Sequence, residues 1–316
     1  MRRTLTSWLV VFALLAAGFG ATVLALNNDV FSAHGFVRSY LQALARHDSA
    51  EALAFAGVDV PEGAGTTLLV DGALGEVRDI QFIGESSKDG ITTVRFEYTL
   101  SSGTQRSEFH VEHAGSRFAL FDAWRFVDAP IALLTVTVDN DSRFEANGVE
   151  STAGTPEAVL IPSIYVIDHS TEYLEAEAVE VSAIEPGGSL DAQLAVTPTP
   201  AFGAAAEDAI AAFLDTCASQ QVLMPTGCPF GFVEANRLDG APEWAMTAYP
   251  TATLSSGPQP NTWTATGAGG AVQLTATVRS LFDGSTSTLD ESITVAGSYT
   301  LSIGADNSVS VLAAQS

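Results

Sequence analysis

Apolar residues follow one another without a charge near the N-terminus of the chain. Residues 8–26 read WLVVFALLAAGFGATVLAL, nineteen positions of which Thr22 is the single polar one. As a helix that rises 1.5 Å per residue, this run is about 28 Å long, which is close to the hydrocarbon thickness of a bilayer. The pattern therefore predicts a transmembrane helix over residues 8–26.

Two arginines precede this apolar run. Arg2 and Arg3 favour an N-terminus that stays in the cytoplasm, which predicts a cytoplasmic tail over 1–7, a single pass through the cell membrane and an extracytoplasmic bulk of the chain. A cleaved signal peptide is the alternative, because residues 23–25 offer small side chains at a cleavage site. Small residues also recur every fourth position along the run, and self-association could occur through this stripe. They are Ala13, Ala17, Ala21 and Ala25.

Beyond the apolar run, the hydrophobic period changes from that of a helix to that of strands. Residues 31–48 carry apolar side chains at 3.6-residue spacing, and Ser49 stands as a cap before a second short helix that ends at residue 56. β-branched and aromatic residues, separated by glycine-containing turns, then predict four strands. They cover 78–84, 91–101, 104–113 and 118–126. A helix packed on a curved antiparallel sheet is the simplest assembly, so we expect a first cone-like α+β domain over 31–129.

The pattern changes again after residue 129. Short strands broken by Asn-Gly and proline-containing turns predict a small all-β module over 130–197, and a proline-rich linker follows over 198–203. A second amphipathic helix and seven strands then repeat the order of helix and sheet, which predicts a second cone-like domain over 204–316. The predicted fold class is α+β, with an N-terminal transmembrane helix and two helix-on-curved-sheet domains separated by a small all-β module.

Acidic residues far outnumber basic ones. The chain has 37 Asp and Glu against 13 Lys and Arg, and its net charge is −24. Such a surface repels phosphate backbones, which excludes nucleic acid as a partner. Residues 131–200 are the most one-sided segment, and they would form either a docking face for a cationic partner or calcium, or a solvated surface.

The motifs of common catalytic and metal sites do not occur. No G-x-S-x-G, H-E-x-x-H, phosphate-binding glycine loop or Walker-type lysine is found after the apolar run. His110 and His113 lie three apart in a predicted strand, so their side chains face opposite sides and cannot share a metal. Residues 139–142 begin like a calcium loop, but Arg143 and Phe144 stand where a ligand and a glycine are required.

The remaining titratable residues do not form a site by their spacing either. We interpret the isolated histidines and the densest run of carboxylates as solvated or core groups. They are His34, His47, His169, Glu172, Glu175, Glu177 and Glu180. The sequence therefore predicts no catalytic, cofactor-binding or metal site, and a protein that is not an enzyme.

The chain has two cysteines, Cys217 and Cys228, at a C-x10-C spacing. This is not the C-x-x-C of redox catalysts, and two thiols without nearby histidines cannot complete a tetrahedral zinc site. Outside the cytoplasm an even pair indicates a disulfide, with paired free thiols as the alternative. Closing about a dozen residues stabilises by about 3 kcal/mol in the chain-entropy model.

The order of these segments resembles several known families. The helix FVRSYLQALARHDSAEAL and the strands after it look like the cone-shaped fold of nuclear-transport-factor-like and cystatin-like proteins. The middle module, with FEANGV at 144–149 and LIPSIYV at 160–166, is similar to the PEGA-type β domains of cell-surface proteins. Residues 223–231, LMPTGCPFG, look like a segment of uncharacterised single-pass envelope proteins of high-GC Gram-positive bacteria, and the layout resembles that of the TcaA-type membrane proteins.

These resemblances imply a membrane-anchored, extracytoplasmic cell-envelope protein. Its role would be non-catalytic binding or structural work, in wall homeostasis or stress sensing, with a cell-wall or envelope protein as partner. The alternative is a small-molecule-binding protein or an enzyme that uses a pocket in a cone-shaped domain. Such a pocket would be lined by Phe96, Tyr98 and Trp124, or by Trp244 and Trp263.

Overall fold

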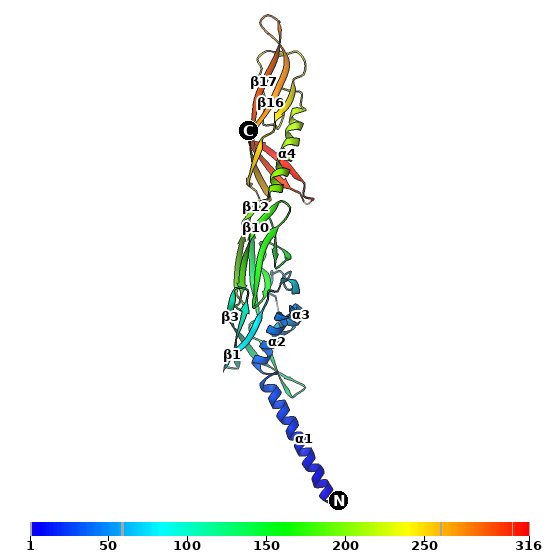
Figure 1. Ribbon diagram of the computed structural model, residues 1–316, viewed down its shortest axis with the longest axis vertical. Helices are drawn as coiled ribbons and strands as arrows, with labels where there is room; N and C mark the ends of the chain where they lie inside the picture. The colour runs from blue at the N-terminus through cyan, green and yellow to red at the C-terminus, as the bar shows by residue number, and fades with distance from the viewer. Residues whose placement is uncertain (1, 58–59, 260, 305, 316) are drawn as a thin grey trace. The chain divides into compact units, whose positions relative to one another are not determined.

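The computed structural model describes residues 2–57, 60–259, 261–304 and 306–315 of the chain (Figure 1). It divides into two compact units. Unit 1 consists of Met1–Thr137, Arg143–Asp168 and Ala178–Leu194, and unit 2 consists of Val138–Ser142, His169–Glu177 and Ala195–Ser316.

The described residues form four α-helices and a short 3-10 helix. The α-helices are α1 Arg2–Asn28, α2 Ala33–Ala45, α3 Ser49–Ala56 and α4 Pro200–Ala218, and the 3-10 helix is Asp71–Ala73. Side-chain caps fix where the helices begin: the Ser32 hydroxyl accepts a hydrogen bond from the Gly35 N–H of α2, and Thr199 caps α4 in the same way. Gly57 ends α3 in the left-handed conformation that its missing Cβ allows.

The predicted transmembrane helix is corrected by the structure. Residues 8–26 lie within α1, but among the residues whose side chains the structure describes, no single helix is long and apolar enough to cross a membrane. Among these residues, the segment Phe12–Asn28 meets the criteria only as a pair with α2, across a bend of 60°. The predicted self-association through the alanine stripe stays a prediction.

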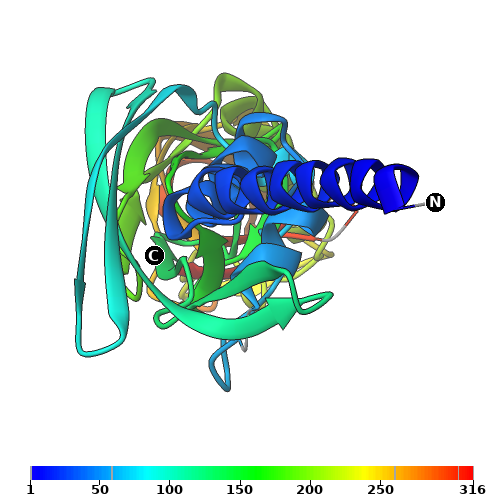
Figure 2. The ribbon, with the colours of Figure 1, turned by 90° about the horizontal axis from the view of Figure 1, so that it is seen from below.

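Four strands follow α3 in an antiparallel meander, in the order β1-β2-β3-β4. They are β1 Arg78–Lys88, β2 Ile91–Leu100, β3 Gly103–Arg117 and β4 Phe121–Phe126. Seen from below, the cyan hairpin of this sheet stands to one side of α1 (Figure 2). Side chains of β2 alternate between buried and partly exposed, which is the period of a strand with one face on a core. Aromatic rings of α2 pack on that face, with Tyr40 5.3 Å from Phe126 and 6.3 Å from Phe109 between ring centroids.

Strands β5 to β12 form two further sheets, with the orders β11-β5-β8 and β12-β10-β9-β6-β7. These strands are β5 Ile131–Val138, β6 Arg143–Ala146, β7 Val149–Thr152, β8 Glu157–Leu160, β9 Ser163–Ser170, β10 Leu174–Ala183, β11 Ser189–Leu194 and β12 Val196–Pro198. Within unit 1 they share a core with the first sheet: the Tyr40 hydroxyl of α2 donates to the Ile161 carbonyl, and the Ser107 hydroxyl of β3 donates to the Ile184 carbonyl.

Unit 2 is built around one long hairpin. Its sheet has the order β13-β16-β17-β18, and β14 and β15 also pair with β16. The strands are β13 Arg237–Leu238, β14 Glu243–Ala248, β15 Thr251–Ser256, β16 Thr262–Arg279, β17 Thr286–Ile303 and β18 Val309–Gln315. Helix α4 packs on this sheet through Phe202, 5.5 Å from Trp263 between ring centroids, and through Phe213, 6.2 Å from Tyr299.

The predicted fold class is wrong. The chain is 48% strand and 20% helix, and its several sheets do not form two helix-on-curved-sheet domains around a separate β module. The physical reason lies in the segment between α3 and β1, which has no hydrophobic period and runs along the middle strands. The Gly65 N–H donates to the Pro156 carbonyl, and the Gly75 N–H donates to the Ser163 hydroxyl. The predicted domain boundaries at 129/130, 197/198 and 203/204 stay predictions.

Candidate functional site

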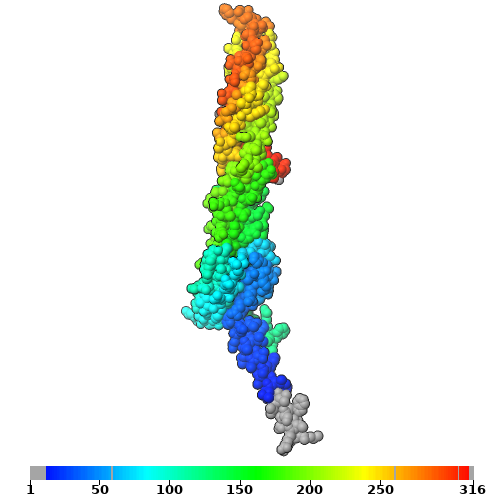
Figure 3. Space-filling view, viewed as in Figure 1, coloured from blue at the N-terminus to red at the C-terminus, as the bar shows by residue number. Residues whose placement is uncertain are grey.

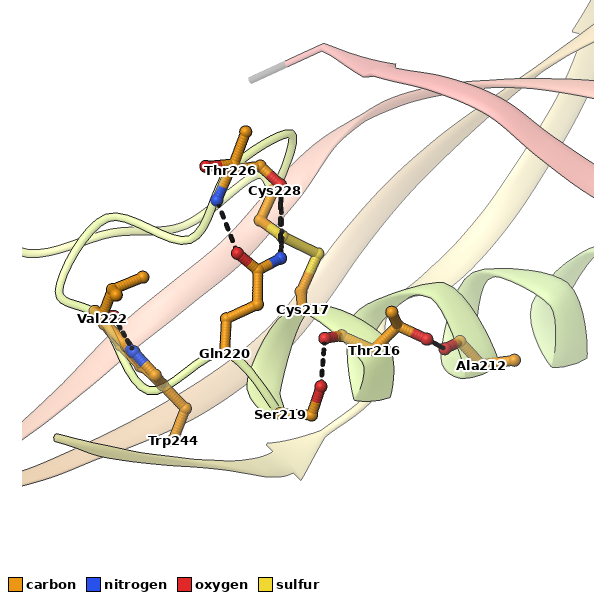
Figure 4. The surroundings of a disulfide bond; sticks show 9 residues. All are labelled: Ala212, Thr216, Cys217, Ser219, Gln220, Val222, Thr226, Cys228 and Trp244. Carbon is orange, nitrogen blue, oxygen red and sulfur yellow. Dashed lines mark hydrogen bonds between the residues drawn. A yellow bond between two sulfur atoms is a disulfide. The ribbon is translucent and has the colours of Figure 1, made fainter. Parts of the chain in front are cut away.

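The predicted disulfide between Cys217 and Cys228 is confirmed (Figure 4). Cys217 lies buried in the last turn of α4, and the Cα atoms of the two cysteines are 5.7 Å apart. The bond closes a loop between α4 and the strands that follow. We call residues 217–231 the cysteine loop.

Hydrogen bonds and packing hold the cysteine loop in addition to the disulfide. The Gln220 side-chain amide pairs with the backbone of Thr226, whose N–H donates to Gln220 Oε1 at 2.8 Å. The Trp244 indole donates to the Val222 carbonyl at 2.8 Å, and its ring lies 5.1 Å from that of Phe230 between centroids. Figure 4 shows both hydrogen-bonded pairs, Gln220 with Thr226 and Trp244 with Val222. This arrangement is a staple that orders a loop.

The histidines bind different carboxylates. His110 Nδ1 lies 3.0 Å from Asp128 Oδ2, and His113 Nε2 lies 3.3 Å from Asp122 Oδ1. His34 contacts Glu85 at 3.3 Å near the start of α2. Within the described ranges, no group of three or more His, Cys, Asp or Glu side chains could hold a metal ion.

His169 differs from its predicted place. The sequence places it in a polar loop, but it lies buried in β9, with Nε2 3.5 Å from Asp141 Oδ2. Asp141 also accepts from the Ser142 N–H at 2.6 Å, which makes the calcium-like segment 139–142 a turn. In the acidic run, Glu172 accepts a hydrogen bond from Asn307 at 3.2 Å.

Three tyrosine hydroxyls are buried in unit 1 and bind backbone carbonyls or a serine. Burial raises the pKa of Tyr98 to about 12, while its hydrogen bond with Ser107 lowers it in part. Burial also raises the pKa of Tyr165 and that of Tyr40 far above the usual value for tyrosine. All three are therefore neutral at physiological pH and act as hydrogen-bond donors in the core.

One of the aromatic residues proposed for a pocket does line one. A cavity of about 150 Å³ opens between the end of α1, α2, α3 and β4. Its lining consists of Val30, Phe31, Phe36, Ser39, Phe55, Arg117, Asp122, Ala123 and Trp124. The other four candidates, Phe96, Tyr98, Trp244 and Trp263, are buried core residues.

Two hairpin tips carry exposed apolar side chains, which the sequence reasoning did not single out. The first connects β3 to β4, where Phe118 is 88% exposed and Leu120 is 44% exposed. The second connects β16 to β17, where Leu281 is 73% exposed and Phe282 is 99% exposed. Neighbouring apolar side chains in a tight connection are the signal that could have found them, because a tight turn offers little surface that could cover them.

The chain was compared with protein-family models, with curated proteins and with solved structures, and none of them matches it.

Proposed function

We propose that this protein is exported and works at the cell membrane, as a component of the cell envelope that binds a partner or provides structure without catalysis. The disulfide carries the proposal. Disulfides persist in oxidising compartments and are rare in the cytosol, where thiols are kept reduced. The pair Cys217 and Cys228 is bonded and one member is buried, so the bond serves the fold.

The N-terminal helix supports a location at a membrane. Large apolar side chains of α1 are exposed to solvent rather than packed against the rest of unit 1. They include Phe12, Leu14, Leu15, Phe19 and Leu24. In Figure 3 the blue helix extends away from the rest of unit 1, and no other element covers it on the visible face. A helix with this surface is stable in water only at a cost, and a lipid environment removes that cost.

The tip of the long hairpin in unit 2 supports a binding role. Phe282 projects almost fully into solvent beside Leu281, and exposed neighbouring apolar side chains often mark a contact with another protein. The net charge of −24 favours a partner whose surface is basic. A basic envelope protein is therefore the partner class that we propose.

Fusion reporters test the location. Alkaline phosphatase at the C-terminus is active only after export, and green fluorescent protein at the same place fluoresces only in the cytoplasm. We expect an active phosphatase fusion that sediments with membranes, and loss of both properties when residues 8–26 are deleted. A fluorescent C-terminal fusion, or Cys217 and Cys228 found as free thiols in cells, would contradict export.

A second candidate function is the binding of a small molecule in the cavity beside Trp124. The cavity of about 150 Å³ is the observation that favours it, since engineered apolar cavities of about this size bind benzene. Arg117 and Asp122 at its lining would select a ligand with an ionisable group. Benzoate and benzylamine should raise the melting temperature of the protein, and filling the cavity with Ser39→Leu should abolish the shift. A wild-type protein that responds to neither compound would exclude this candidate.

A further inference from the structure

The β3–β4 tip, residues 117–121, presents apolar side chains on a convex turn. Phe118 is 88% exposed and Leu120 is 44% exposed. These side chains are not covered by another part of unit 1, and their contact with water is unfavourable. The sequence contains no glycine between Arg117 and Phe121, so the turn is made by residues that carry Cβ atoms.

The backbone of the tip is held in an unfavourable conformation. Phe118 has φ 52° and Ala119 has φ 56°, so both are in the left-handed region. For residues with a Cβ this region is costly, and it persists where surrounding contacts impose it. Here the conformation directs an aromatic ring away from the protein. Such strain is typical of sites where the exposed group has a use.

The end of α1 fixes the position of the tip. Asn27 Nδ2 donates to the Leu120 carbonyl at 2.9 Å, and Asn27 Oδ1 accepts from the Asp122 N–H at 3.2 Å. Next to these bonds, the rings of Phe31 and Phe121 stack with centroids 4.4 Å apart. The tip is therefore attached to the helix that carries the exposed apolar side chains, and Figure 1 shows the two side by side.

The apolar surface of the tip continues that of α1. Leu24 and Val30 are exposed at the end of the helix, near the tip that Asn27 binds. Arg117 stands at the start of the tip and is exposed. An arginine beside apolar residues suits the interface of a bilayer, because its long stem stays in the apolar layer while the guanidinium reaches headgroup phosphates.

We propose that the β3–β4 tip is a membrane contact, which inserts Phe118 and Leu120 into the interfacial layer of a bilayer beside the exposed apolar side chains of α1. This inference rests on the proposed membrane location. We commit to a lipid surface as the occupant because Asn27 attaches the tip to α1, the helix whose large apolar side chains are exposed. A bilayer interface accepts isolated aromatic and aliphatic side chains without a matching pocket.

A nitroxide at Ala119 measures the depth of the tip. Ala119→Cys in the full chain leaves Phe118 and Leu120 in place, and Cys217 and Cys228 are disulfide-bonded and do not take the label. The matched control is Ser102→Cys, in the exposed turn between β2 and β3, which the meander places at the opposite end of the same sheet. Both labelled proteins are mixed with vesicles of phosphatidylcholine that contain a minority of phosphatidylglycerol, and sedimentation shows whether the protein binds. The accessibility of the nitroxide to oxygen and to a water-soluble nickel complex is then measured on the bound protein.

We expect the label at position 119 to be more accessible to oxygen and less accessible to nickel than the label at 102. Adding Phe118→Ser and Leu120→Ser to Ala119→Cys should return the label to the values at 102, with the circular dichroism unchanged. Equal accessibility at 119 and 102 in vesicle-bound protein would overturn the inference while the membrane location stands. Protein that stays in the supernatant would contradict the membrane location itself, and the inference with it.

Discussion

The indole nitrogen of Trp244 donates a hydrogen bond across 2.8 Å to the carbonyl of Val222, which lies inside the loop that the disulfide closes. Trp244 belongs to β14, so the bond connects the cysteine loop to the sheet of unit 2. The tryptophan ring also packs on Phe230 of the same loop. Its fluorescence therefore reports whether the loop keeps its place.

Removing the disulfide should destabilise unit 2 without unfolding it in the absence of denaturant. Cys217→Ala together with Cys228→Ala gives back the chain entropy of the closed loop, about 3 kcal/mol in the chain-entropy model. Urea unfolding followed by tryptophan fluorescence measures the loss. A reductant should lower the stability of the wild type by a similar amount and leave the double variant unchanged. If the reductant lowers the stability of the wild type and of the double variant by the same amount, the disulfide does not account for that loss.

The hydrogen bonds from Asn27 to the β3–β4 tip give a second prediction. Asn27→Ala removes both, and at about 1 kcal/mol for each net hydrogen bond the local opening of the tip should become easier by about 2 kcal/mol at most. Amide exchange at the Asp122 N–H, which loses its acceptor, should become faster. Asn28→Ala, one residue further along α1, is the matched control and should leave this exchange rate unchanged.

Some elements could be predicted because their signals are local. The second short helix was predicted to end at 56, as α3 does, and the predicted strand 91–101 matches β2 within one residue. The disulfide followed from two cysteines and an inferred oxidising location. In β16, however, the glycines at 267, 269 and 270 favour a break between two strands. The structure instead has a bulge there, and pairing with β17 continues on both sides.

Non-local contacts explain the larger errors. The predicted strand 118–126 covers the β3–β4 tip, because Phe118 and Leu120 are typical strand residues and neither Phe118 nor Ala119 favours the left-handed conformation. The bonds from Asn27, more than ninety positions earlier, hold the turn, and the local sequence carries no signal of them. The segment after α3 likewise shows no period, and its place depends on buried groups such as Glu157 that lie far away in the sequence.

Glu157 offers a direct test of how that segment is held. Its carboxylate is 4% exposed, accepts from the Thr67 N–H at 3.0 Å, and accepts from the Ser151 hydroxyl at 2.8 Å. Glu157→Ala leaves the Thr67 N–H and the buried Ser151 hydroxyl without this partner, which should lower the free energy of unfolding by about 1–3 kcal/mol. In Glu157→Gln the new side chain keeps an oxygen that accepts from the Thr67 N–H, and its amide group can donate to the Ser151 hydroxyl. The free energy of unfolding should therefore fall by less than about 1 kcal/mol.

Urea unfolding of these two Glu157 variants, with Glu150→Gln as an exposed control, measures the difference. Amide exchange at Thr67 should become faster in Glu157→Ala only. Equal stability of Glu157→Ala and the wild type would show that the segment is held by its backbone bonds alone, such as that from Gly65 to Pro156.

The buried hydroxyl of Tyr98 makes the stability of unit 1 depend on pH in the alkaline range. Its pKa in the folded protein is about 12, against about 10 in an unfolded chain. Above pH 10 the unfolded chain loses this proton while the folded protein keeps it, so the unfolded state binds fewer protons and stability falls as pH rises. The stabilisation is fully present below pH 10, and about 2 kcal/mol of it is lost by pH 12.

Tyr98→Phe should therefore lose less stability than the wild type between pH 10 and pH 12, since it removes one of the groups that cause the loss. At neutral pH it should lie within about 1 kcal/mol of the wild type, because the Ser107 hydroxyl still donates to the Ile184 carbonyl. Ser107→Ala is the informative companion: it keeps the tyrosine and removes the bond that lowers its pKa, so the alkaline loss should persist and extend to higher pH. The urea midpoint of unfolding, measured for each protein between pH 10 and pH 12, tests this prediction. If the midpoints of the wild type and of Tyr98→Phe fall equally with pH, the alkaline loss belongs to other groups, among them the buried Tyr40 and Tyr165.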